Sequence, residues 1–233
     1  MAPLTRSIAA ELLLLALDDE SGRPLLDGTR LHAAHAGDAL LDLTLDGVLE
    51  LAPPEQGRGS PRLRRTGAAA PDDPLLAQIA EVADGKKPRT AVGALTGMTF
   101  TDRARKLKQQ LLERLAAEGV LTERRSKLIG LFPVTRWPQV DDRAEQAVRD
   151  RLREVLVDGA EPDARTAALV GVLGAVDLVP KLMPDQDRKQ LRRRVEQIGD
   201  GDWAGRAVKD SVEAVLSAVL TAAVVSGVVA GSG

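Results

Sequence analysis

The sequence predicts a mainly helical fold: a single helical domain over residues 1–233, with small β-hairpins, built around a buried apolar helix near the C-terminal end. Apolar residues recur at helical spacing along most of the chain. No charged residue follows Glu213, and this last stretch is rich in Ala, Val and Leu. Short segments beside Gly and Pro alternate as strands do. With 44% hydrophobic and 28% charged residues, the chain resembles a soluble globular protein that buries a core.

The first two helices are expected at residues 7–18 and 29–45. Ser7 is a suitable N-cap, and the run of four leucines that follows leaves no polar face, so this helix should be buried nearly all round. The acidic residues, Gly and Pro within 18–24 indicate an ordinary turn. The end of the second helix is ambiguous, because residues 41–45 also alternate like a strand.

Short hairpins and amphipathic helices are expected along the rest of the chain. A first hairpin is predicted from strands at 48–51 and 62–66. A second is predicted after Gly119, from apolar segments at 120–122 and 128–134 that flank a polar stretch. The helices expected from apolar spacing, caps and terminating Gly residues are 72–83, 90–95, 103–118, 141–158, 166–178, 185–198 and 203–230.

The last of these helices is expected to be central to the core. Its Ala-rich apolar stretch is short and weakly hydrophobic compared with the roughly 20 strongly apolar residues that span a bilayer. Packing inside the domain is therefore favoured over a membrane tail, and Val215, Val219 and Val224 are predicted core residues.

The composition argues against most kinds of catalysis. The chain has no Cys, which excludes disulfides, thiol catalysis and zinc sites made of Cys. Aromatic residues make up only 2%, little for a small-molecule pocket or a base-stacking surface. No phosphate-binding loop or nucleophile motif occurs. His32, His35 and Asp38 share one helical face, but no fourth ligand is evident, so packing is favoured over metal binding. We expect no enzyme activity, no cofactor and no metal.

Positive charge is the more informative feature. The formal net charge is −2, yet Arg103, Arg105, Lys106 and Lys108 lie within two turns of one expected helix. The hairpin after it combines basic residues at 124–127 with bulky apolar ones, which are Leu128, Ile129, Leu131 and Phe132, with Trp137 beyond. Basic and apolar groups side by side suit contact with an anionic bilayer. The same hairpin would serve equally as a contact between copies of the chain.

Two other interpretations use the same residues. A solvated basic face, balanced by nearby Glu, needs no ligand at all. A helix followed by a basic hairpin is also the pattern of a winged-helix nucleic-acid-binding regulator, whose cations would meet phosphates. The negative net charge and the absence of a clear base-reading helix count against nucleic acid as the partner.

Three segments resemble the Golgi phosphoprotein 3 family. They are residues 4–22 (LTRSIAAELLLLALDDESG), 39–49 (ALLDLTLDGVL) and 111–121 (LLERLAAEGVL). The hairpin that ends at Phe132 and the apolar C-terminal helix also fit. Arg outnumbers Lys by 24 to 8, which is typical of GC-rich genomes, so the resemblance is to a bacterial, actinobacterial member of the family.

The resemblance implies a peripheral membrane protein that binds phosphatidylinositol 4-phosphate, located in the cytoplasm at the inner face of the membrane. It implies a homo-oligomer whose hydrophobic hairpin also contacts lipid, with protein clients still to be identified. The family's two headgroup-binding Arg residues on the helix before the hairpin fall on Arg105 and Lys108. Its pocket Trp and a further Arg fall on Asp27 and Ala36, and Arg30 is the nearby cation expected to compensate.

Overall fold

The structure is a computed structural model, and it describes residues 7–54, 59–96, 103–128 and 132–230. Ten helices and two two-stranded antiparallel sheets occur in these ranges, which confirms the mainly helical fold class. The helices are α1 (Ile8–Leu15), α2 (Gly28–Leu45), α3 (Pro74–Ala83), α4 (Pro88–Leu95), α5 (Arg103–Ala117), α6 (Arg143–Leu156), α7 (Ala164–Ala175), α8 (Val179–Leu182), α9 (Arg188–Asp200) and α10 (Arg206–Ala230).

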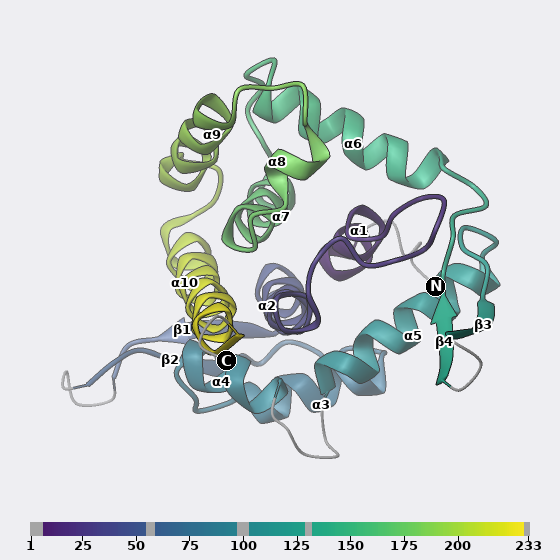
Figure 1. Ribbon diagram of the computed structural model, residues 1–233. Helices are drawn as coiled ribbons and strands as arrows, with labels where there is room; N and C mark the ends of the chain where they lie inside the picture. The colour runs from purple at the N-terminus through teal and green to yellow at the C-terminus, as the bar shows by residue number, and fades with distance from the viewer. Residues whose placement is uncertain (1–6, 55–58, 97–102, 129–131, 231–233) are drawn as a thin grey trace.

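Helix α2 lies in the middle of the molecule, and α1, α3, α5, α7 and α10 are arranged around it (Figure 1). Its residues from Leu31 to Thr44 are almost all buried, so it has no solvent face over that length. This explains the alternating pattern at its end: Leu41, Leu43 and the residues between them are buried on every side of a helix, not on one face of a strand. The helical interpretation of the second element is confirmed.

The C-terminal helix α10 packs along α2, α4 and α7. Val212, Val215 and Val219 are fully buried, as the sequence predicts for two of them. Val224 is 56% exposed and Leu220 48% exposed, so the prediction of Val224 as a core residue is wrong. The helix is covered on one side only, because α10 lies at the edge of the helix assembly instead of inside it (Figure 1). None of the helices described is long and apolar enough to cross a membrane.

The start of α1 is closed by a residue from α2. Ser7 occupies the N-cap position, but its side chain makes no capping bond to α1, contrary to the expected role. Its hydroxyl instead donates to the Asp42 carboxylate at 2.7 Å, and the same carboxylate accepts the backbone N–H of Ile8 at 3.0 Å. Arg165 of α7 donates to Asp42 as well. Asp42 therefore links α1, α2 and α7 at one buried point.

The strands differ from expectation mainly in the second hairpin. Strands β1 (Leu49–Ala52) and β2 (Arg62–Arg65) pair as predicted. Strands β3 (Arg124–Leu128) and β4 (Phe132–Arg136) show that the polar stretch at 123–127 is largely strand and not turn. The predicted first strand at 120–122 is therefore wrong, whereas the predicted second strand at 128–134 overlaps β4. Residues 129–131, which separate the two strands in the sequence, lie outside the described residues.

Close contact between α2 and α10 yields a prediction about Gly37. A Cβ built on Gly37 would lie 2.2 Å from Cγ2 of Val219, so Gly37→Ala should destabilise the fold by about 1–3 kcal/mol through overpacking. Gly93 of α4 is the matched control, since a Cβ there meets nothing within 4 Å, and Gly93→Ala should stabilise by about 0.4–1 kcal/mol. Urea unfolding of both variants checks this, and a neutral Gly37→Ala would contradict the tight packing.

Candidate functional site

Two cations of α5 lie three residues apart on one helical face. Arg105 is exposed and Lys108 is half-buried, and this spacing puts their Cβ atoms about 5–6 Å apart. Burial lowers the pKa of Lys108, and the positive charge of Arg105 lowers it further. Lys108 has no ion pair with any carboxylate among the residues described. A partly desolvated cation beside another cation, with no carboxylate paired to it in the described part of the chain, is suited to receive an anion.

Helix α2, which packs against α5, carries the two histidines His32 and His35. His35 is fully buried, and its pKa is lowered to about 3 by burial and then by the charges of Lys108 and His32. The effect of the Lys108 charge on His35 agrees with the packing of α2 on α5. His32 is half-buried and lies one turn from His35 on the same helix. No group of three or more His, Asp or Glu side chains that could hold a metal occurs among the residues described.

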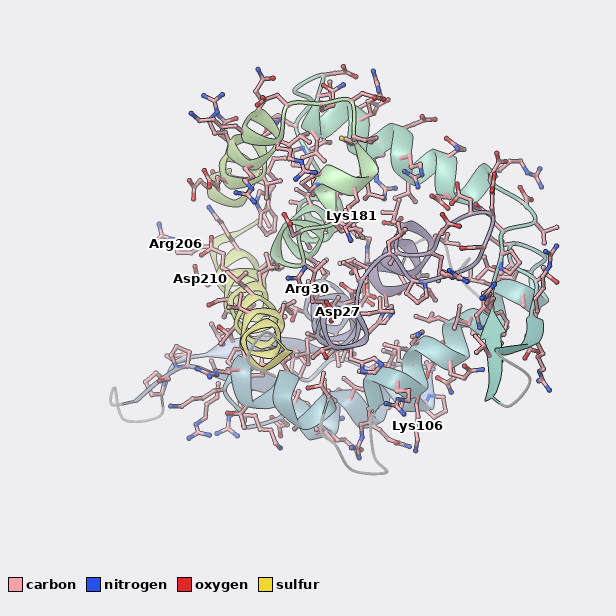
Figure 2. The ribbon with its side chains drawn as sticks, viewed as in Figure 1. Asp27, Arg30, Lys106, Lys181, Arg206 and Asp210 are labelled. Carbon is pink, nitrogen blue, oxygen red and sulfur yellow. The ribbon has the colours of Figure 1, made fainter. Side chains whose placement is uncertain are left out.

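Arg30 is placed differently from the α5 cations. Successive helical residues turn by about 100°, so Arg30 leaves α2 on nearly the opposite side from His32. Arg30 pairs with Asp27 at 3.4 Å, and Figure 2 shows this pair at one end of α2, with Lys106 of α5 at the lower edge of the molecule. Asp27 caps α2 by accepting from the backbone N–H of Arg30, and Ala36 is buried. The positions of the family's Trp and further Arg therefore serve helix capping and packing here.

The hairpin β3–β4 carries a second group of positive charge. Arg124 lies directly opposite Arg136 in the register, an arrangement of like charges that destabilises a strand pair unless an anion lies close by. Arg125 is neutralised by Glu123 at 2.6 Å. Figure 1 shows α5 and the hairpin along the lower right of the molecule, so both cation groups lie toward one edge.

Only some of the apolar residues predicted for the hairpin tip lie within the described residues. Ile129 and Leu131 lie outside the described residues, and for Leu128 and Phe132 the structure gives the backbone pairing of the strands alone. Trp137 is 7% exposed, and its backbone lies against Gly22. The interpretation of Trp137 as an exposed membrane-contacting residue is therefore wrong, because this ring belongs to the core.

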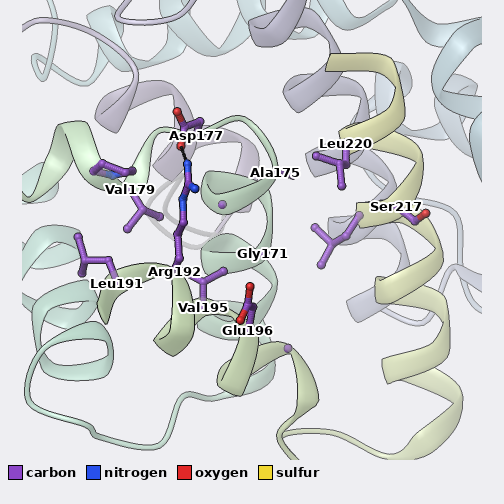
Figure 3. Close-up of a pocket in the computed structure, with 14 residues that line it drawn as sticks. Gly171, Ala175, Asp177, Val179, Leu191, Arg192, Val195, Glu196, Ser217 and Leu220 are labelled. Atoms are coloured by element: carbon purple, nitrogen blue, oxygen red, sulfur yellow. Dashed lines mark ion pairs between the residues drawn. The ribbon is translucent and has the colours of Figure 1, made fainter. Parts of the chain in front are cut away.

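An apolar groove of about 460 Å³ lies between α7, α9 and α10, away from α5 (Figure 3). Leu220 of α10 and Val195 of α9 form facing walls, and Arg192 pairs with Asp177 at 3.7 Å on the rim. The low aromatic content of the chain did not reveal this hollow, whose walls are aliphatic. The available signal was the pair Gly171 and Gly174 in α7, because glycines at this spacing allow side chains of neighbouring helices, here Leu216 of α10 and Val195 of α9, to approach α7 closely.

These features define a mainly helical protein that presents cations from a helix and from a hairpin on one edge. The profile of the Golgi phosphoprotein 3 (GPP34) family matches residues 8–215, and the chain belongs to this family. The resemblance to this family seen in the sequence is thereby confirmed. The family is known for peripheral Golgi proteins that bind phosphatidylinositol 4-phosphate. No curated protein matches the chain.

Proposed function

We propose that this protein is a non-catalytic peripheral membrane protein of the inner, cytoplasmic membrane face, where it binds an anionic phospholipid headgroup similar to that of phosphatidylinositol 4-phosphate. The observation that carries the proposal is the half-buried Lys108, which has no carboxylate partner among the described residues and lies on the same face of α5 as Arg105. Phosphate is an anion that satisfies two such cations at once.

The family supports the same class of ligand. Its members are known to bind a phosphorylated lipid headgroup, and the positions equivalent to their Arg pair keep positive charge at Arg105 and Lys108. Lys is a point charge and not a planar fork, so Lys108 fits a phosphate of any orientation. Arg30, paired with Asp27, is proposed as an outlying cation that adds to the general attraction.

The hairpin is proposed as the second point of attachment. Positive charge near an anionic bilayer contributes about 1 kcal/mol per cation. Leu128, Ile129, Leu131 and Phe132 would add burial in the interface once Arg124 and Arg136 approach lipid phosphates. The same apolar residues are proposed to join copies of the chain into a homo-oligomer away from the membrane.

A vesicle panel tests the proposal. The protein is sedimented with phosphatidylcholine vesicles alone and with vesicles that also contain phosphatidylglycerol, phosphatidylinositol or phosphatidylinositol 4-phosphate, at several salt concentrations. Binding only to the anionic vesicles, weaker at high salt, is expected. Binding to duplex DNA with a steep salt dependence, and to no vesicle, would favour a nucleic-acid regulator instead. Binding to neither would leave the cations as a solvated face.

Neutralising the α5 pair should weaken vesicle binding strongly. The double variant Arg105→Gln, Lys108→Gln removes two cations worth about 1 kcal/mol each, so affinity for anionic vesicles should fall about thirty-fold. Lys106→Gln is the control, because Lys106 is exposed and points away from Lys108 on the same helix. Equal losses of affinity in Lys106→Gln, Arg105→Gln and Lys108→Gln would mean diffuse electrostatic attraction without a headgroup site.

Removing the apolar tip should affect assembly and membrane contact together. In the variant Leu131→Ser, Phe132→Ser, light scattering should show a lower mass and vesicle binding should weaken, since burying each of these side chains is worth about 1.5–3 kcal/mol. The melting temperature should change little. A large fall in melting temperature, with mass and binding unchanged, would assign these residues to the core.

A further inference from the structure

The apolar groove between α7, α9 and α10 has the size and lining of a small-molecule site. Its volume of about 460 Å³ falls within the range of roughly 300–1,000 Å³ that is usual for ligand pockets. Leu216 and Leu220 of α10, one helical turn apart, form one wall, and Val195 of α9 forms the facing wall (Figure 3). No aromatic residue occurs among the described residues that line the groove. The walls therefore suit an aliphatic chain better than an aromatic ring, which would find no ring to stack on.

The groove is open to solvent in the single chain. Leu220 is 48% exposed, and Leu216 and Val195 are half-buried. An aliphatic chain lying between them would remove apolar surface from water on both sides, and this is favourable.

The end of α7 beside the groove carries a carboxylate where the backbone favours glycine. Asp177 follows the C-cap of α7 with a φ of 57°, and among the residues described no other non-glycine residue has a positive φ. Its N–H donates to the carbonyl of Gly174. The next N–H, that of Leu178, donates to the carbonyl of Leu173. These two bonds form a Schellman motif, which usually has Gly at this position. A negative charge is also unfavourable at the C-terminal end of a helix, so the stability of α7 gives no reason for an Asp here.

The contact that Asp177 makes is with Arg192 of α9, at 3.7 Å. Figure 3 shows the Arg192 side chain directed toward Asp177 and away from Glu196. Arg192 lies four residues before Glu196, a spacing at which opposite charges on a helix can pair. No ion pair of Glu196 occurs among the residues described, although its side chain lines the groove. Asp177 thus engages the cation that could otherwise neutralise Glu196.

The other cations of α9 do not line the groove. Arg194 donates to the carbonyls of Val155 and Ala160, and the lining residues include neither Arg188, Lys189 nor Arg193. Because the charge of Arg192 is met by Asp177, the charge left uncompensated along the groove is the carboxylate of Glu196. A ligand that complements the groove therefore combines an aliphatic chain with a positively charged head.

We propose that this groove binds a small amphiphile with one aliphatic chain and a primary ammonium head. The chain lies between Val195 and Leu220, and the ammonium group pairs with the carboxylate of Glu196. Asp177 is a positioning residue, which acts by holding Arg192 away from Glu196. The groove lies away from α5, so this site does not depend on the anion site of the proposed function.

Three soluble probes with the same eight-carbon chain test the proposal: octylammonium, octanol and octanoate. Methyl NMR of the Leu and Val side chains locates each probe and measures its affinity. The signals of Leu216, Leu220 and Val195 should shift, and affinity should fall from octylammonium through octanol to octanoate. Leu220→Ser should weaken the binding of all three probes. Val224→Ser is the matched control and should weaken none, since Val224 is an exposed residue of the same helix outside the groove lining.

Two substitutions test the head of the ligand. Glu196→Gln should weaken octylammonium binding about two- to five-fold, as expected for an exposed ion pair, and leave octanol binding unchanged. Asp177→Asn should also weaken octylammonium binding, because the released Arg192 can pair with Glu196. Asn suits the left-handed backbone at this position, so the melting temperature should not fall. In an Arg192→Gln background, Asp177→Asn should have no effect on octylammonium affinity, an outcome that a merely structural role of Asp177 does not produce.

Several results would overturn the proposal. They are the absence of methyl shifts with every probe, equal affinity for the three probes, and tighter binding of octanoate. Methyl shifts that depend on protein concentration without any probe would show that the groove is an interface between copies of the chain. The variant Arg105→Gln, Lys108→Gln should bind octylammonium as the wild type does. A failure of vesicle binding and a failure of this site can therefore be told apart.

Discussion

Val219→Asp should abolish folding. Val219 is fully buried where α10 meets α2, in contact with Gly37 and within the hydrophobic core. An uncompensated charge in the core costs several kcal/mol, and a domain of this kind is stabilised by only about 5–15 kcal/mol in total. Circular dichroism should show lost helix, and the variant should bind a hydrophobic dye or aggregate on expression.

The same helix supplies the control. Val224 is 56% exposed, so Val224→Asp should change the free energy of unfolding by less than about 0.5 kcal/mol. Deleting residues from 212 onward should have the effect of Val219→Asp, because it uncovers the face of α2 that α10 covers. A folded, soluble deletion variant that has lost only its membrane association would instead identify α10 as an anchor.

Arg165→Met should lower the free energy of unfolding by about 3–5 kcal/mol near pH 8. This is the usual penalty for leaving one member of a buried ion pair without its partner. The Asp42 carboxylate is 5% exposed and accepts from Arg165. Burial already raises the pKa of Asp42, and Arg165 is among the groups that hold it down. Arg165 also pairs with the exposed Asp46, a contact of little energetic weight.

The loss should depend on pH in a defined direction. Without Arg165 the pKa of folded Asp42 rises further, so the folded state binds more protons than the unfolded state between about pH 4 and that raised value. Stability of Arg165→Met should therefore fall, relative to the wild type, as pH rises through this window. Urea unfolding at pH 5 and pH 8 measures the difference. Adding Asp42→Asn should recover part of the loss at pH 8, and an equal loss at both pH values would contradict the charge argument.

Much of the fold could be predicted because apolar spacing reflects burial directly. Leu107, Leu111 and Leu115 form a regular stripe in the sequence, and all three are buried on one face of α5. The four-residue helix α8 was missed, since one turn has no periodicity to detect. The missed contacts are those between distant residues: nothing local to Ser7 indicates that Asp42, 35 positions later, would cap α1.

The candidate site, like the fold, could be predicted from the sequence only in part. Arg105 and Lys108 share a face because three residues make almost one turn. The direction of Arg30 depends on Asp27 capping α2, which a gap-free match to the family did not suggest. The effect of the Lys108 charge on the pKa of His35 could not be predicted, because it depends on the packing of α2 on α5, a tertiary contact.

The place of α10 in the chain has a consequence for biosynthesis. This helix covers one side of α2 and follows every other described helix in the sequence. During translation at about 5–20 residues per second, α2 and its apolar neighbours leave the ribosome many seconds before their last partner does. The nascent chain must keep that surface from aggregating until Val212, Val215 and Val219 emerge, so folding is expected to complete only after α10 has left the ribosome and to draw on chaperones that bind exposed apolar helices.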